Sequence, residues 1–198
     1  MHLSLLLLIF FLAIAGLLWF FVPMASGIPF VPTDAKRIRK ALEMAELRPG
    51  ETFYDLGCGD GRVLVAAARD FGAGAVGIEI SPLHCLAAWL RVRVAGIGKR
   101  VRVRWGDIYK AKLGEADVAF QYGHSHMADR LRRHLAEELH DGSRFVSVNV
   151  DMPGWQPSAV DREARIFLYR MPPIAGDVGS YLMLESKNSP GVGKTPGE

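Results

Sequence analysis

A glycine-rich stretch, Asp55-Leu56-Gly57-Cys58-Gly59-Asp60-Gly61, carries the strongest chemical signal in this chain of 198 residues. It follows a predicted strand over Thr52–Leu56 and opens a predicted helix over Gly61–Phe71. Glycines allow a tight turn and let the backbone come close to a ligand. In an open parallel sheet, ligands bind at the carboxyl ends of the strands. The pattern therefore predicts a cofactor-binding loop, although a tight strand-to-helix turn without a ligand has the same composition.

Acidic residues stand at the ends of the next two predicted strands. Glu79 lies 20 residues after Gly59, where a carboxylate can accept hydrogen bonds from both ribose hydroxyls. Asp107 follows the third strand and could accept from the exocyclic amine of an adenine, with Ile108 against the ring. Asp107 alone would be explained as a turn residue. Together with the acidic residues of the glycine-rich stretch, Glu79 and Asp107 place acidic side chains at the ends of three consecutive strands. This arrangement favours a nucleoside-containing ligand.

The spacing of the glycines separates two such ligands. The dinucleotide fingerprint G-x-G-x-x-G requires a glycine where Arg62 stands, and the pattern here is G-x-G-x-G. A ligand without a pyrophosphate has less need of that third glycine. We therefore expect S-adenosylmethionine (SAM) as the cofactor rather than NAD.

The elements that must position these residues alternate between strands and helices. The predicted strands are Thr52–Leu56, Ala75–Ile80, Val101–Trp105, Asp117–Tyr122 and Arg144–Val150. The predicted helices are Asp34–Glu46, Gly61–Phe71, Pro82–Ala95 and Met127–Leu139. This alternation predicts an α/β fold whose parallel sheet is covered on both faces. Two further strands, Ala164–Tyr169 and Ser180–Leu184, have no helix between them and should pair antiparallel.

Side-chain patterns add detail to two of these helices. Thr33 is the expected N-cap of the helix over Asp34–Glu46, and Ser81 that of the helix over Pro82–Ala95. An apolar stripe on the second helix is formed by Leu83, Leu86, Ala87, Leu90 and Val94.

The N-terminal segment has the composition of a membrane anchor. Leu3 to Val22 is a run of 20 residues without a charge, and a helix of that length spans about 30 Å, the thickness of the hydrocarbon core of a bilayer. A cleaved signal peptide is the alternative, but only Met1 and His2 precede the run. Basic residues follow it closely, which by the positive-inside rule places the folded domain on the cytoplasmic side. Two cysteines without a disulfide framework agree with a reducing compartment.

Four parts of the chain follow from these patterns. Residues 1–22 are the predicted transmembrane anchor, and residues 23–33 form a linker with prolines and glycines. Residues 34–187 form the predicted catalytic domain, and residues 188–198 a disordered tail.

The block from Thr52 to Val150 resembles the class I SAM-dependent methyltransferases, whose Rossmann-like sheet has seven strands and ends in an antiparallel hairpin. The resemblance implies that Gly57, Gly59 and Asp60 contact the methionine part of SAM and that Asp55 braces the loop. It assigns the ribose to Glu79 and the adenine to Asp107. Ile80 and Ile108, the neighbours of these acids, complete the predicted cofactor site.

A narrower resemblance rests on Pro29-Phe30-Val31-Pro32-Thr33, which follows the hydrophobic segment. It is similar to the motif before the catalytic domain in a small family of lysine methyltransferases, which includes mitochondrial enzymes acting on ATP synthase and on the adenine nucleotide translocase. The resemblance implies a membrane-tethered protein-lysine methyltransferase with a membrane-protein substrate, in which Pro32 and Thr33 close over the SAM pocket. A stiff linker would have the same composition.

The sequence gives less evidence about the residues that contact the methyl acceptor. Gln121-Tyr122-Gly123-His124 follows the fourth strand and lacks the Asn/Asp-Pro-Pro-Tyr that marks methyltransferases acting on planar amide or base nitrogens. Tyr122 is placed to orient an acceptor amine, and Asp151, at the end of the fifth strand, to take its proton. Polar residues at strand ends are also often only turn formers. We expect these two residues to be the catalytic ones.

Other functions stay open on this evidence. The acceptor could be a small molecule or a lipid headgroup, and a SAM-binding module without transfer activity would carry the same loop. A net charge of +3 gives no reason to expect a nucleic acid partner. His124 and His126 lack the further ligands of a zinc set, so no metal is expected. The arginines of the helix over Met127–Leu139 are predicted to form a solvated face.

Overall fold

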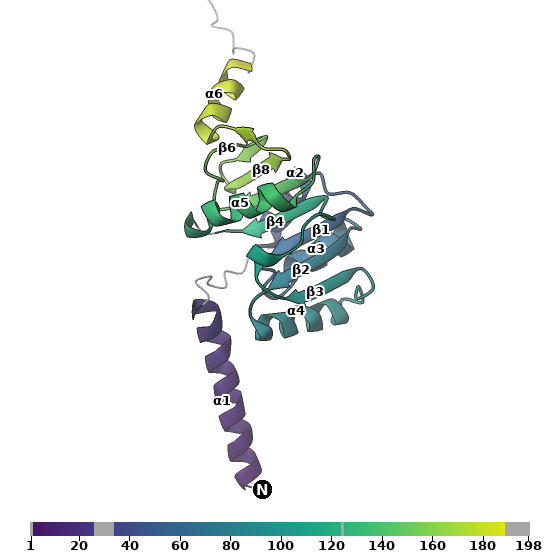
Figure 1. Ribbon diagram of the computed structural model, residues 1–198. Helices are drawn as coiled ribbons and strands as arrows, with labels where there is room; N and C mark the ends of the chain where they lie inside the picture. Colours follow the sequence, from purple (N-terminus) through teal and green to yellow (C-terminus); the bar gives the residue numbers. More distant parts are fainter. Residues whose placement is uncertain (1, 26–33, 124, 189–198) are drawn as a thin grey trace, which may run out of the picture.

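The computed structural model describes residues 2–25, 34–123 and 125–188. Its centre is a seven-stranded sheet with the strand order β3-β2-β1-β4-β5-β8-β7 (Figure 1). The five parallel strands are β1 (Thr52–Leu56), β2 (Gly74–Glu79), β3 (Val101–Trp105), β4 (Val118–Tyr122) and β5 (Arg144–Val148). β8 (Ile166–Arg170) runs antiparallel to β5 and to β7 (Ala159–Asp161). The predicted Rossmann-like α/β class, with a seven-stranded sheet and a terminal hairpin, is confirmed.

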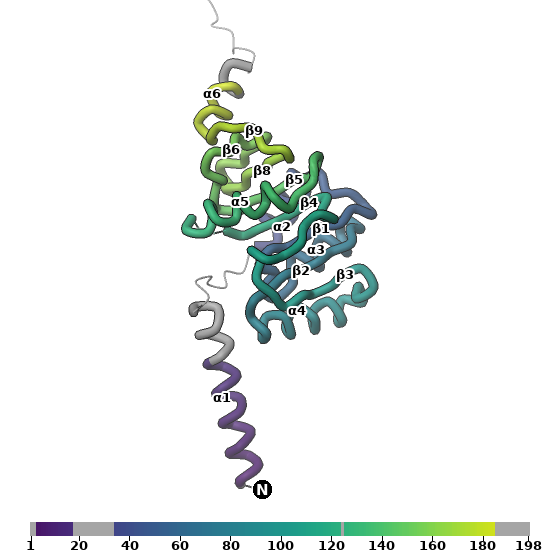
Figure 2. Tube along the Cα trace, in the orientation of Figure 1, coloured from purple at the N-terminus to yellow at the C-terminus, as the bar shows by residue number. Residues whose placement is uncertain are grey.

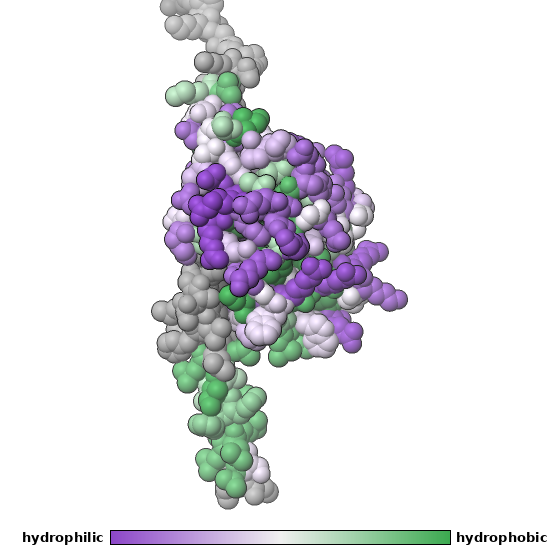
Figure 3. Space-filling model, viewed as in Figure 1, coloured by the Kyte–Doolittle hydropathy of each residue, from purple (hydrophilic) through white to green (hydrophobic). Residues whose placement is uncertain are grey.

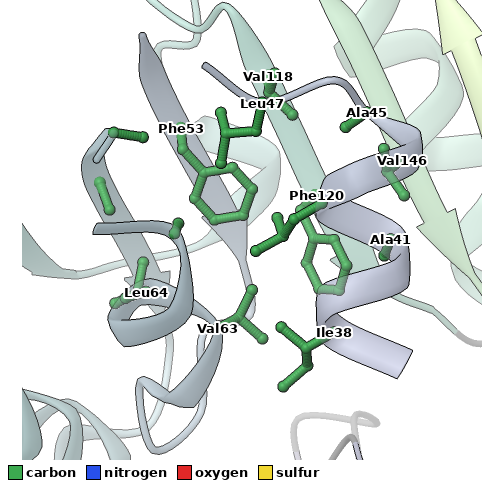
Figure 4. Close-up of a cluster of buried hydrophobic side chains, with 14 of the residues drawn as sticks. Ile38, Ala41, Ala45, Leu47, Phe53, Val63, Leu64, Val118, Phe120 and Val146 are labelled. Carbon is green, nitrogen blue, oxygen red and sulfur yellow. The ribbon is translucent and has the colours of Figure 1, made fainter. Parts of the chain in front are cut away.

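Helices cover both faces of this sheet. One face carries α2 (Ala35–Met44), α3 (Arg62–Asp70) and α4 (Pro82–Val94), and the other carries α5 (Ala128–Glu138). Figure 4 shows the first of the two cores, where the rings of Phe53 and Phe120 lie between the side chains of α2 and α3. Their centroids are 6.1 Å apart. Apolar residues on alternate strand positions thus hold the sheet between two helical layers.

The composition of the terminal hairpin differs from the prediction. Ser180–Leu184, predicted as a strand, lies within the helix α6 (Val178–Asn188). The Asp177 Oδ1 atom accepts a hydrogen bond of 2.6 Å from the backbone N–H of Ser180 and so caps this helix. β7 takes the place of the predicted strand. Figure 2 shows α6 beside the small ribbon of β6 (Trp155–Gln156) and β9 (Ile174–Ala175) at the C-terminal end of the trace.

Two capping predictions have different outcomes. Asp34, not Thr33, occupies the N-cap of α2, and Thr33 itself lies outside the described residues. Ser81 caps α4 as expected, because its Oγ atom accepts a hydrogen bond from the N–H of His84.

The apolar stripe predicted for α4 is where the structure departs most from a simple amphipathic pattern. A helix on a sheet normally turns its apolar stripe toward the core. Here the residues that α4 buries are His84, Ala88 and Val92. The larger members of the stripe, among them Leu86 and Leu90, point away from the sheet and are about half exposed. The small side chain of Ala88 allows close packing at the middle of α4, where a Cβ atom on Gly61 would lie 3.0 Å from Ala88 Cβ.

The N-terminal helix α1 (His2–Ala25) continues two residues beyond Pro23, where the sequence predicted its end. Over the residues that the structure describes, no helix has both the length and the hydropathy needed to cross a bilayer. The side chains described in α1 are those of Leu3–Leu17, a segment that rises about 22 Å against roughly 30 Å for the hydrocarbon core. The transmembrane anchor predicted over residues 1–22 is therefore not confirmed.

Gly77 of β2 marks the tightest packing in the sheet. A Cβ atom there would lie 2.5 Å from Leu64 Cδ1 and 2.6 Å from Cys58 Sγ. We expect Gly77→Ala to lower the free energy of unfolding by about 1–3 kcal/mol through overpacking, measured by urea denaturation. Gly74→Ala, in the same strand, is the matched control because its nearest neighbour would be 3.8 Å away. Equal stability of the two variants would contradict this packing.

Candidate active site

The glycine loop leaves β1 and turns back across the end of β2. Gly57, Gly59 and Gly61 have φ angles of 92°, 52° and 77°, in the left-handed region that glycine adopts without strain. The N–H groups of Gly57 and Cys58 both donate to the carbonyl of Ile78, at 2.9 and 3.1 Å. The backbone of the loop is thus tied to β2 at the carboxyl edge of the sheet.

Glu79 links the loop to the start of α4. Its Oε2 atom accepts a hydrogen bond from the N–H of Gly59, and its Oε1 atom accepts one from the N–H of Ser81, both at 2.9 Å. The side chain is nearly buried. Because each carboxylate oxygen has two lone pairs, the capacity to accept from a ribose hydroxyl is retained. The ribose contact of Glu79 stays a prediction with which this hydrogen bonding is compatible.

Asp55 is buried beneath the loop, and its Oδ2 atom has no hydrogen-bond partner. Burial, reinforced by the charges of Glu79 and Asp60, raises the pKa of Asp55 well above its usual value. The predicted bracing of the loop by Asp55 is therefore not made through this oxygen. A buried acceptor without a donor fits a ligand that brings a cationic donor, such as the ammonium of the methionine part of SAM.

Asp60 has a different environment only five residues along the chain. Its carboxylate accepts hydrogen bonds from Arg62 Nε at 3.0 Å, Arg62 Nη2 at 2.8 Å and Arg91 Nη2 at 2.6 Å. Burial opposes ionisation, but the hydrogen bonds and charges of Arg62 and the charge of Arg91 lower the pKa of Asp60. Asp60 thus joins the loop to α3 and α4 as an ionised group.

The adenine side of the predicted site is built around Asp107. Its Oδ1 atom accepts from the N–H of Tyr109 at 3.0 Å, which starts the short helix η1 (Ile108–Lys110). The guanidinium of Arg130, from α5, lies 3.8 Å from the ring centroid of Tyr109 and 4.0 Å from Asp107 Oδ2. The side chain of Ile108 packs into the core and is only 4% exposed. Little of its surface is therefore accessible for the predicted contact with an adenine ring. Ile80 is 39% exposed and Trp105 72% exposed, so both are available apolar side chains at this edge.

The acceptor side contains a cavity of about 330 Å³ next to the ends of β4 and β5. Gly123, Ser125, Asn149, Val150, Asp151 and Arg165 line it. Asp151 is exposed and forms no ion pair with any residue that the structure describes. Tyr122 is not among the lining residues, so the structure brings only one of the two predicted catalytic residues to the cavity wall.

Arg37 of α2 organises the residues behind this cavity. Its Nη1 atom donates to Tyr122 Oη at 3.4 Å, its Nη2 atom to Asn149 Oδ1 at 2.5 Å and its Nε atom to the carbonyl of Ala164 at 2.6 Å. The guanidinium also lies 5.6 Å from the ring centroid of Tyr122. Asn149 has a φ of 76°, which is uncommon for a residue with a side chain and is supported here by these contacts. Arg37 therefore connects Tyr122 to the end of β5.

Several of these arginines were not predicted as parts of the site. Arg37, Arg91 and Arg130 lie on three different helices, and each reaches a residue far away in the sequence. Arg130 was expected on a solvated face and its side chain is 60% exposed, while its guanidinium also covers Tyr109. An arginine on a helix gives no local sign of the carboxylate or ring that it will contact.

The sheet order, the glycine loop and the carboxylates at consecutive strand ends together define a class I SAM-dependent methyltransferase. A comparison with known families identifies the family within this class. The ANTKMT methyltransferase domain matches residues 55–159, and the chain belongs to that family. Its cofactor is SAM.

Known proteins with similar sequences agree with this assignment. A protein-lysine N-methyltransferase of Saccharolobus islandicus (strain REY15A) is 34% identical over 134 residues, which are 67% of this chain and 83% of that protein. An ATP synthase lysine N-methyltransferase of Mus musculus is 31% identical over 130 residues, 66% of this chain and 52% of that enzyme. The chain thus spans about half the length of the mouse relative.

A solved structure is also similar. The RNA methyltransferase from Salinibacter ruber, in complex with S-adenosyl-L-homocysteine, superposes with a TM-score of 0.70 at 37% identity. The match covers 72% of this chain and 94% of that one. A bound product of SAM in that structure agrees with the cofactor predicted from the glycine spacing.

The environment of Asp55 leads to a test of the cofactor site. Because its folded-state pKa is raised, the buried carboxyl destabilises the fold as the pH rises from the usual carboxyl range toward that pKa. Asp55→Asn should therefore stabilise the ligand-free protein at pH 8 by about 1 kcal/mol or more, and the gain should vanish in acid. The same variant should weaken SAM binding by at least about tenfold, because a charged acceptor is lost.

Thermal denaturation across pH and calorimetric titration with SAM measure the two effects. Asp70→Asn is a suitable control, since Asp70 is a surface carboxyl paired with Arg39 and Arg69. Unchanged SAM affinity in Asp55→Asn would remove Asp55 from the cofactor site.

Proposed function

We propose that this enzyme is a protein-lysine N-methyltransferase, with Asp151 as the group that removes the proton from the acceptor. The observation that carries the proposal is the cavity beside β4 and β5, where the Asp151 carboxylate has no cationic partner among the described residues. The same wall contains Arg165, whose Nη2 atom donates to the carbonyl of Asn149, so Asp151 is the carboxylate that is left for an ammonium group. The two lysine methyltransferases similar in sequence support the same substrate class.

The chemistry requires a neutral amine, and the residues around the cavity favour one. When bound, SAM supplies a methyl group already activated on a sulfonium. Asp151 would take one proton from the lysine ammonium, which leaves the nitrogen lone pair free to form the new N–C bond. Arg37, a permanent cation behind Tyr122, disfavours a second positive charge nearby and so promotes deprotonation. Tyr122 does not line the cavity, so it would act from behind the wall, through its contact with Arg37, which in turn holds Asn149.

We propose further that the enzyme works at a membrane, where α1 provides the association. Apolar side chains of α1 are largely exposed, including Leu3 at 71%, Phe10 at 64% and Phe11 at 69%. Exposed apolar surface of this extent indicates contact with lipid or with another protein. A membrane protein is therefore the proposed substrate.

The first experiment is transfer of labelled methyl from SAM to a membrane extract, with Glu79→Ala as the inactive control. Label on lysine in a protein band, absent with the variant, supports the proposal. Label in extracted lipid would favour lipid methylation. Label in RNA would favour the substrate class of the Salinibacter ruber relative. SAM binding without transfer to any pool would indicate a binding module.

The role of Asp151 is tested on the labelled substrate. We expect Asp151→Asn to lower kcat by about 10²- to 10⁴-fold without changing SAM affinity, because general-base assistance is lost. Part of the loss should be recovered at higher pH, where more of the lysine is neutral. Glu137→Gln on the exposed face of α5 should leave kcat unchanged. A pH-independent defect in Asp151→Asn would argue for a structural role.

A further inference from the structure

The helix α4 is apolar on both of its faces. Its inner face, with Ala88 and Val92, packs on the sheet. Its outer face carries Leu86, Trp89, Leu90 and Val94, whose exposed fractions are 52%, 49%, 48% and 89%. These four residues, spaced three and four apart, form one stripe along the helix. We call this stripe the outer face of α4.

Positive charge is concentrated in the segment that contains this outer face. The segment from Ser81 to Trp105 contains six lysines and arginines and no acidic residue, whereas the whole chain carries only +3. The six are Arg91, Arg93, Lys99, Arg100, Arg102 and Arg104. Lys99 and Arg100 follow α4 directly and form no ion pair within the described part of the chain. Arg102 and Arg104 alternate along β3 with Val101 and Val103, which pack on the same core as α4, so these two arginines lie on the opposite face of the sheet. The rest of the molecule is net acidic, so the positive charge is concentrated here.

Trp89 lies within this stripe, and its ring contacts one of the cations. The guanidinium of Arg93 lies 5.2 Å from the centroid of the Trp89 ring. A second exposed tryptophan, Trp105, stands at the end of β3, 72% exposed, with its Nε1–H donating to the carbonyl of Ile80. Tryptophan and arginine together are typical of the boundary between lipid and water.

The outer face of α4 lies on the same side of the molecule as α1. The two helices are in contact, and Figure 3 shows apolar surface over α4 along the rim of the domain from which α1 extends. A bilayer next to α1 would therefore also meet α4.

We propose that the outer face of α4, together with Arg93, Lys99 and Arg100, forms a docking surface for an anionic lipid bilayer. The apolar stripe enters the headgroup boundary, while the arginines and lysines contact acidic headgroups. This docking surface is separate from the catalytic cavity. It makes the proposed membrane location more specific, and its biological purpose rests on that proposed function. Vesicle binding is measured without methyl transfer, so its failure and that of the proposed activity are distinguishable.

Docking through α4 would also orient the catalytic edge. Ile80 and Trp105, at the carboxyl ends of β2 and β3, continue the exposed apolar surface to the edge of the sheet that carries the glycine loop. The SAM site would then lie beside the headgroups. An acceptor lysine close to the bilayer surface would meet it there.

The apolar contribution is tested with the full chain and vesicles of phosphatidylcholine containing phosphatidylglycerol. Leu86→Gln with Leu90→Gln should weaken co-sedimentation by about tenfold, because two half-exposed leucines no longer leave water. Ile174→Gln with Leu184→Gln, which change exposed residues on β9 and α6, should bind as the wild type does. Equal binding by all three proteins would overturn the proposal.

The charge contribution has its own matched pair. Lys99→Gln with Arg100→Gln should reduce binding to the acidic vesicles by roughly 30-fold and leave binding to pure phosphatidylcholine unchanged. Arg133→Gln with Arg162→Gln, from α5 and from the turn after β7, is the control with the same charge loss. Equal losses in the two pairs would indicate net charge alone and overturn a specific surface.

A second copy of the chain is the competing occupant of this face. Sedimentation equilibrium without lipid distinguishes it. A concentration-dependent dimer that the Leu86 and Leu90 substitutions abolish, together with unchanged vesicle binding, would assign the face to self-association and overturn lipid docking.

Discussion

The carboxylate of Glu79 holds together the part of the structure on which the rest depends. It accepts from the backbone of Gly59 on one side and of Ser81 on the other, and so joins the glycine loop to the first turn of α4. The loop can come this close only because Gly77 offers no side chain beneath Cys58. A buried carboxylate that lost these donors would carry the full cost of its desolvation. The position of the cofactor loop is therefore coupled to the placement of α4.

Acidic groups of the same type serve different purposes along this edge because their neighbours differ. Asp55 is buried without a donor, which raises its pKa and leaves an oxygen for a cationic ligand. Asp60 is held ionised by two arginines and acts as a link between α3 and α4. Asp151 faces a cavity and has no cation of its own among the described residues. The three carboxyl groups thus differ in their surroundings, which is the basis of the separate roles proposed for them.

The helix α4 connects this site to the outside of the molecule. Its N-terminus receives the Glu79 hydrogen bond through Ser81, its inner face packs on the sheet, and its outer face remains apolar. An apolar outer face costs solubility unless something covers it. Because α4 contacts α1, a membrane that bound α1 and the outer face of α4 would lie close to the edge of the sheet that carries the cofactor loop.

The sequence by itself determined the strand and helix order, the cofactor loop and the acids at the strand ends, because glycine spacing and local periodicity are properties of neighbouring residues. It was wrong for Ser180–Leu184, where an Asp177 cap and long side chains favour a helix over a strand. Only the tertiary structure decided which face of α4 is buried, since apolar residues on both sides of this helix leave it without a locally preferred side. It also decided that Arg37 reaches Asn149 across 112 positions of sequence, because such a contact depends on packing between elements and leaves no trace in either segment alone.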